Sequence, residues 1–325
     1  MYSKNDIDNL AINLNFIRDN MEKVVRLCTI LEYINTDPML AKYLVLKGGT
    51  AINLLVIPLP RLSVDIDLDF TESCDRPAML RFRKTITEKL QAYMYANGYR
   101  LTPGSKHPFS VDSWVFQYTN VIGNLDNIKV EINYSMRSHL LPTETKPIKL
   151  HGFENVKVRS LAQVELYASK VKALLERGAA RDLFDVHNMI QNQVISEEQK
   201  PLLRKGVVFY SAVGGNMKPT GTYSFQSIER LQFKQIRTTL LPVLKKGTFY
   251  DLESAKREVC SYLENLMQLS VNERLFIERF ASNEYQPELL FEDKEIVERI
   301  AEHPMALWKT QNSTQHKNPS RHRQR

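Results

Sequence analysis

A double glycine followed by an alternating run of acids constrains this chain more than any other feature. Gly48 and Gly49 interrupt the apolar segment LVLKGGTAINLL, and the later segment RLSVDIDLDF alternates acidic with apolar residues. A period of two predicts a β-strand whose successive side chains point to opposite faces of the sheet. Asp65 and Asp67 therefore share one face, about 7 Å apart along the strand.

Paired carboxylates beside glycines are typical of a site for a metal and a phosphate. Two unpaired acids raise each other's pKa, and a divalent cation such as Mg²⁺, which prefers oxygen ligands, relieves that repulsion. Without side chains, Gly48 and Gly49 allow the backbone to approach a triphosphate, and a helix beginning there favours an anion. Thr50 can cap that helix or donate its hydroxyl to phosphate. Asp65 and Asp67 are the predicted metal ligands.

A third acid is expected on a neighbouring strand. The segment IKVEINY also alternates, which places Lys129, Glu131 and Asn133 on one face. Glu131 is the predicted third metal ligand, and Asp69 is expected to be solvated or to support the others. The alternative is that the glycines form an ordinary turn and the acids line the wet face of an edge strand.

A second group of charges follows a long helical pattern. If the segment from Lys170 to Arg181 is one continuous helix, Lys170, Arg177 and Arg181 share a face and Lys172 lies nearly opposite. Such a cluster would neutralise charge on a transferred phosphate, with Asp185 orienting one of the cations. The alternative is a surface helix whose ion pairs contribute little.

Several other residues have two possible roles. Arg61 and Ser63 precede the acidic strand and either hold that strand or reach phosphate. Arg137 is a candidate for nucleotide contact. Met305 and Trp308 are expected to pack the C-terminal helices rather than stack on a base.

The order of the patterns predicts an α+β fold with a small mixed sheet. Helices are expected over 7–33 and 76–97, strands over 64–70, 99–101, 114–118 and 128–134, and helices again from 161 to 308, with a break near Gly178. We expect a core with an N-terminal helical segment over 1–155, a helical C-terminal domain over 156–310, and a disordered basic tail over 311–325.

Composition excludes several classes of protein. The net charge is +7, but the tail carries most of the excess, so the charge is weak evidence for nucleic-acid binding. The three cysteines lack the spacing of a zinc site. The start of the chain does not resemble a signal peptide, and no apolar run reaches the length of a membrane span. We expect a soluble, cytoplasmic protein.

Together these segments resemble a known family. The strings LKGGTAINLL, PRLSVDIDL, EINYSMR, SKVKALLERGAARDLFDV and HPMALWK are similar to the AbiEii/AbiGii nucleotidyltransferase toxins, within the polymerase-beta-like superfamily that includes the MenT-type toxins. The likeness covers about residues 10–310 and is specific in combination. One departure is a longer gap between the glycines and the acids, which falls in the turn 57–60.

The resemblance implies a nucleotidyltransferase core and assigns roles to the same residues. It implies that the nucleotide is bound by Gly48, Gly49, Thr50, Lys170 and Arg177. It implies metal binding by Asp65 and Asp67, beside Glu131. The catalytic set is then Asp65, Asp67, Lys170 and Asp185, with Asp182 as the alternative to Asp185.

The resemblance also implies a reaction and its partners. Such enzymes use a nucleoside triphosphate with Mg²⁺, or Mn²⁺, and related ones modify the acceptor end of tRNA. An AbiEi-type antitoxin is typically encoded nearby without forming a stable complex, and the system acts in abortive phage infection. Two alternatives remain open: a nucleotidyltransferase that modifies a protein or small molecule, and a non-catalytic nucleotide-binding module.

Overall fold

A single mixed sheet organises the fold in the computed structural model, which describes residues 2–214 and 221–312. Its seven strands lie in the order β3-β4-β5-β2-β1-β7-β6. Their bounds are β1 (Leu44–Lys47), β2 (Asp65–Phe70), β3 (Arg100–Leu101), β4 (Val111–Thr119), β5 (Leu125–Asn133), β6 (Glu144–Pro147) and β7 (Lys157–Ser160). β2–β5 and β1–β7 are parallel pairs and the other pairs are antiparallel, so the predicted α+β class with a mixed sheet is confirmed.

The register at the centre of the sheet sets the geometry of the acids. Asp67 of β2 lies opposite Lys47 of β1 on one side and Glu131 of β5 on the other, and Asp65 lies opposite Lys129. Residues in register on neighbouring strands project from the same face. The shared face expected for Asp65, Asp67 and Glu131 is therefore observed.

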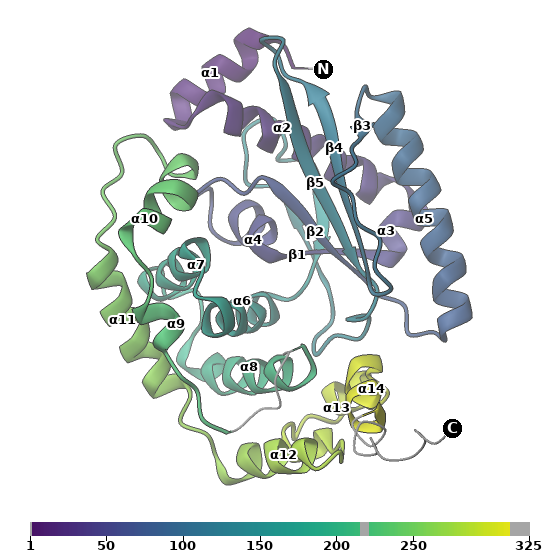
Figure 1. The fold of residues 1–325 in the computed structure, drawn as a ribbon, viewed down its shortest axis with the longest axis vertical. Helices are drawn as coiled ribbons and strands as arrows, with labels where there is room; N and C mark the ends of the chain where they lie inside the picture. The colour runs from purple at the N-terminus through teal and green to yellow at the C-terminus, as the bar shows by residue number, and fades with distance from the viewer. Residues whose placement is uncertain (1, 215–220, 313–325) are drawn as a thin grey trace, which may run out of the picture.

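The opposite face of β2 is apolar and is covered by the N-terminal half of the chain. Phe70 lies with its ring centroid 5.8 Å from that of Phe82, on the long helix that Figure 1 shows beside the sheet. The expected helix over 7–33 is two helices, because Asn15 adopts a left-handed conformation with φ of 61°. The helices before β3 are α1 (Lys4–Leu14), α2 (Arg18–Thr36), α3 (Pro38–Tyr43), α4 (Gly48–Ala51), the π-helix η1 (Ile52–Val56) and α5 (Arg76–Ala96).

Helices dominate the chain after β7, and most of them lie on the side of the sheet away from α5 (Figure 1). The longer ones are α6 (Gln163–Arg177), α7 (Ala180–Gln191), α8 (Lys200–Gly214), α11 (Leu252–Leu266), α12 (Val271–Ala281), α13 (Lys294–Ile300) and α14 (Pro304–Asn312). Short turns between them are η2 (Glu197–Gln199), α9 (Gln226–Glu229), α10 (Phe233–Gln235), η3 (Ile236–Leu240), η4 (Leu241–Val243) and η5 (Pro287–Leu289).

Gly178 separates α6 from α7, so the continuous helix assumed for the basic cluster is wrong. Its φ is 54°, and a β-carbon there would lie 2.1 Å from the carbonyl oxygen of Ser227. Both the backbone conformation and the close approach of α9 require glycine. The break itself falls where the sequence predicted it.

The edges of the expected domains differ from the element boundaries. β6 and β7 were not predicted, and β7 pairs in parallel with β1, so the sheet continues past residue 155. The division at 155 stays a prediction. Helix α14 reaches Asn312, and the rest of the expected basic tail, 313–325, lies outside the described residues. Within the described part of the chain, no helix is both long and apolar enough to traverse a bilayer.

Candidate active site

The double glycine lies where β1 ends and α4 begins, in close contact with two charged side chains. Gly48 has φ of 70°, and a β-carbon there would lie 2.6 Å from Oδ2 of Asp67. A β-carbon on Gly49 would lie 2.5 Å from Nη2 of Arg61. The glycines therefore permit an acid and an arginine to approach the backbone closely.

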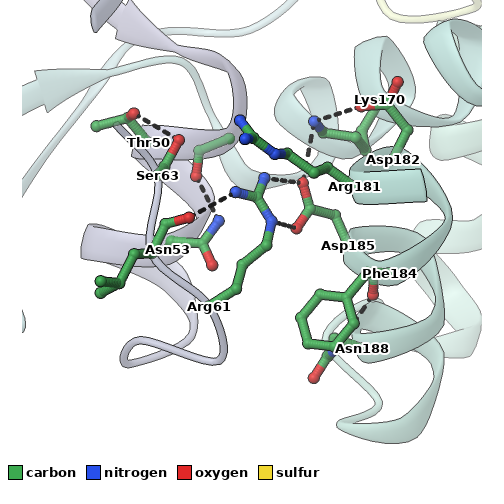
Figure 2. A network of polar contacts seen from close by, with 12 residues as sticks. Thr50, Asn53, Arg61, Ser63, Lys170, Arg181, Asp182, Phe184, Asp185 and Asn188 are labelled. Carbon is green, nitrogen blue, oxygen red and sulfur yellow. Dashed lines mark hydrogen bonds and ion pairs between the residues drawn. The ribbon is translucent and has the colours of Figure 1, made fainter. Parts of the chain in front are cut away.

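Thr50 holds α4 against the acidic strand. Its side chain is fully buried, and its hydroxyl lies 2.5 Å from the carbonyl oxygen of Asp65 and 2.9 Å from Oγ of Ser63. Figure 2 shows the Thr50 and Ser63 side chains turned toward each other. The Thr50 hydroxyl, a predicted phosphate donor, thus hydrogen-bonds within the protein. Ser63 helps to hold α4 against the chain just before β2.

The Asp65 and Asp67 carboxylates have no side-chain partner in direct contact among the residues that the structure describes. Neither makes a hydrogen bond or ion pair with another side chain in the described ranges 2–214 and 221–312. Burial raises the pKa of Asp67, and the charges of Glu131 and Asp65 add to that rise against the opposing charge of Lys47. Bringing a cation to this face would relieve the repulsion.

Two lysines that the sequence analysis did not assign to the site neutralise the remaining acids of this face. Nζ of Lys47 lies 2.5 Å from Asp69, and Nζ of Lys129 lies 2.6 Å from Glu131. With Glu131 turned to Lys129, no three Asp, Glu, His or Cys residues among those described are grouped closely enough to hold a metal ion. The oxygen donors suit Mg²⁺ in chemical type, while the closed three-acid arrangement expected from the sequence is not observed.

A buried network of alternating charges faces the acids from α6 and α7. Arg61 donates to both carboxylate oxygens of Asp185, from Nε at 2.8 Å and from Nη2 at 2.7 Å. Nζ of Lys170 lies 3.0 Å from Asp185 and 2.9 Å from Asp182. Figure 2 shows Arg61 reaching from the loop before β2 to the Asp185 side chain on α7. The network joins the two halves of the molecule.

The charges in this network keep one another ionised. Burial alone would lower the pKa of Lys170, but the Asp185 and Asp182 carboxylates outweigh burial and raise it. Burial would likewise raise the pKa of both carboxyl groups, but their cationic partners hold both values below the ordinary range. Lysine has three donors, and two of those on Lys170 face carboxylates.

Arg177 and Arg181 have different environments. Nε of Arg177 lies 2.6 Å from Oδ2 of Asp182, while 66% of its side chain stays exposed. Arg181, now on α7, donates from Nε to the carbonyl oxygen of Thr239 at 2.8 Å. Arg177 is therefore held at one end and open to solvent at the other.

Two adjoining cavities lie between the sheet and these helices, and we call them together the cleft. Their volumes are about 350 and 310 Å³, within the range of small-molecule sites. Both are lined by Gly49, Asp67, Lys170 and Arg177. The two groups of residues singled out from the sequence therefore meet in one place.

The cleft also differs from expectation in its rim. Lys172, predicted to lie nearly opposite Lys170 on the helix, also lines the larger cavity. Asp182 lines the smaller cavity, whereas Asp185 lines neither and contacts Arg61 and Lys170 instead. Asp185 is thus placed to position those two cations.

Comparison with known proteins is consistent with this architecture. The profile of a family described as nucleotidyl transferase AbiEii toxin, type IV toxin-antitoxin system, matches residues 29–265. A solved structure of MenT4, a nucleotidyltransferase toxin from Mycobacterium tuberculosis H37Rv, superposes with a TM-score of 0.62 at 16% identity, covering 93% of this chain and 99% of that one. That likeness shows a shared fold. No curated protein matches the sequence.

Proposed function

Because the chain belongs to the AbiEii nucleotidyltransferase toxin family, we propose that its cleft transfers a nucleotide from a nucleoside triphosphate to an acceptor hydroxyl. One observation carries the proposal: sheet carboxylates without an ion-pair partner among the described residues share a space with Lys170 and Arg177 on the facing helix. An oligoanionic substrate with its counter-ion fits between two such walls.

The roles of the residues follow from their positions. Gly48 and Gly49 line the cleft with backbone and approach the phosphates. The third donor of Lys170 and the exposed end of Arg177 neutralise charge that develops on the transferred group. Asp185 holds Lys170 and Arg61 in place, and Asp182 holds Lys170 and Arg177.

The carboxylates on the sheet are the proposed place of a divalent cation. Asp65, Asp67 and Glu131 would hold Mg²⁺, or Mn²⁺, which when bound would neutralise phosphate oxygens. To bind the ion, the Glu131 carboxylate would leave its ion pair with Lys129. The acceptor hydroxyl attacks the α-phosphate, loses its proton, and pyrophosphate leaves with the bridging oxygen. Catalysis by the protein then consists of holding the triphosphate and the acceptor in line within the cleft.

For the acceptor we propose tRNA, with the reaction in the cytoplasm. Family membership supports an antitoxin of the AbiEi type as a functional partner, and we propose a role in abortive phage infection. A protein or small-molecule acceptor, and a module that binds nucleotide without turnover, are the competing outcomes of the following experiment.

The experiment supplies each α-labelled nucleoside triphosphate with Mg²⁺ or Mn²⁺, together with total RNA, purified tRNA or lysate protein. Wild-type enzyme should label tRNA, and Asp67→Ala should label nothing while unfolding at a temperature no lower than that of wild type. Asp19→Ala, which removes an exposed carboxylate on α2, should label tRNA normally. Labelled protein without labelled tRNA would show that the acceptor is a protein. Recovery of intact triphosphate with every acceptor would contradict the enzymatic proposal.

A further inference from the structure

A second hollow of about 490 Å³ lies at the end of the sheet where β5 terminates, beside α14 and the start of α5. Figure 1 shows α14 beyond that end of the sheet. We call this hollow the aromatic groove. Its lining includes Arg76, Phe109, Ser135, Arg137, Met305 and Trp308.

The aromatic groove presents flat rings and positive charge to solvent. Phe109 is 59% exposed and Trp308 is 57% exposed, so the expected packing role of Trp308 does not bury its ring. The guanidinium of Arg76 lies over the Phe109 ring at 4.6 Å from its centroid. None of the described residues that line the groove is acidic, and Arg76 and Arg137 give it a charge of one sign.

A single turn connects the aromatic groove to the cleft. Oδ1 of Asn133 accepts the backbone N–H groups of Ser135 and Met136, at 2.8 and 3.1 Å, which fixes the chain just after β5. Asn133 and Met136 line the cleft, whereas Ser135 and Arg137 line the groove. A molecule seated in the groove therefore lies one turn of backbone away from the cleft.

Exposed rings beside arginines are suited to nucleotides whose bases are not paired. Unpaired bases stack on aromatic side chains, and arginines contact the phosphates between them. A base-paired duplex keeps its bases stacked on one another and offers a protein ring a free face only at its two ends.

Resting on the proposed function, we infer that the aromatic groove binds the unpaired end of the acceptor RNA. Bases next to the terminal nucleotide stack on Phe109 and Trp308, and Arg76 and Arg137 contact their phosphates. The terminal hydroxyl then passes the Asn133 turn into the cleft. The groove thereby selects an acceptor with a single-stranded end.

Intrinsic fluorescence tests the inference without any chemistry. The chain has two tryptophans, of which Trp114 is fully buried, so quenching by an added oligonucleotide reports Trp308. We expect an unpaired oligoribonucleotide to quench wild-type protein in the absence of triphosphate, and a blunt duplex of the same sequence to quench it far less. An unpaired DNA of that sequence tests whether the 2′-hydroxyls contribute.

Affinities of variants locate the binding surface. Phe109→Ala and Trp308→Ala should each weaken RNA binding about 5- to 150-fold, as expected for loss of one stacked base. Because Trp308→Ala removes the fluorophore, its binding is measured by the anisotropy of a labelled RNA. Phe249→Ala removes an aromatic ring that is 87% exposed and does not line the groove, so it should bind normally. Unchanged melting temperatures should accompany all three, since these side chains are exposed.

The outcomes separate this inference from the function it rests on. Equal RNA affinity in wild type, Phe109→Ala and Trp308→Ala would refute the inference that the aromatic groove binds RNA. It would do so even if loss of RNA labelling in Asp67→Ala supported the proposed function. Normal quenching with the expected losses, but no RNA labelled by wild type, would uphold the groove as an RNA site and contradict the proposed reaction.

Discussion

Replacing Gly48 by alanine should cost more in activity than in stability. The residue has φ of 70°, where an L side chain costs about 1–2 kcal/mol of folding free energy. The new β-carbon would lie 2.6 Å from Oδ2 of Asp67, whereas ordinary contact begins at 3.4 Å, so the carboxylate must retreat by about 0.8 Å. A shift near 1 Å in a reacting group can reduce a rate about 100-fold.

A second glycine separates these two effects. Gly247 has φ of 77°, and a β-carbon there would meet no atom within 4 Å. Gly247→Ala therefore introduces the same backbone strain without displacing any side chain. We expect both variants to lose about 1–2 kcal/mol in urea unfolding, and only Gly48→Ala to lose about 100-fold in nucleotide transfer.

The reasoning would be refuted if Gly48→Ala and Gly247→Ala transferred nucleotide equally well under conditions where Asp67→Ala is inactive. Equal activity would mean that the approach of Asp67 to the backbone does not set its working position. A much larger loss of unfolding free energy in Gly48→Ala than in Gly247→Ala would mean that the Asp67 side chain does not move away and that the clash destabilises the packing around it.

Two other substitutions test the charges themselves. Asp185→Asn should lower the free energy of unfolding by about 3–5 kcal/mol, because it leaves the buried Arg61 and Lys170 charges short of a partner. Asp19→Asn, which breaks a partly exposed carboxylate–arginine pair on α2, should cost about 1 kcal/mol or less. Equal losses in urea unfolding for Asp185→Asn and Asp19→Asn would contradict this account. Asp67→Asn should raise the melting temperature at neutral pH, because burial raises the pKa of Asp67 and its ionisation opposes folding. A raised folded-state pKa makes wild-type stability fall as pH rises through the window above the ordinary value of 3.8, so the gain should vanish below that pH, and a gain independent of pH would argue against it.

Local pattern was enough to predict one wall of the cleft. The alternation around Asp65 and Asp67, and again around Glu131, fixes which side chains share a face, because strand geometry has a period of two. The parallel pairing of β2 with β5 then brings Glu131 beside Asp67. The glycines could be assigned to the site, but their contacts with Asp67 and Arg61 could not be predicted.

The other wall depends on contacts that no local period encodes. Arg61 and Asp185 are 124 residues apart in sequence, and only the docking of α7 against the loop before β2 makes them partners. Helical periodicity put Lys172 nearly opposite Lys170, yet both line the larger cavity, because periodicity gives directions around one helix and not how much of the helix borders a space. Lys47 and Lys129 adjoin the acids in register, so neighbouring charges on each strand were the signal that was overlooked.

The Arg61–Asp185 bridge makes the order of translation matter. Residue 61 leaves the ribosome long before residue 185, so a growing chain carries only the carboxylate wall for much of its synthesis. Until α7 emerges and docks, the buried guanidinium of Arg61 lacks the Asp185 carboxylate. A fragment that ends between Lys170 and Asp185 therefore carries Arg61 and Lys170 without the carboxylate that positions them both.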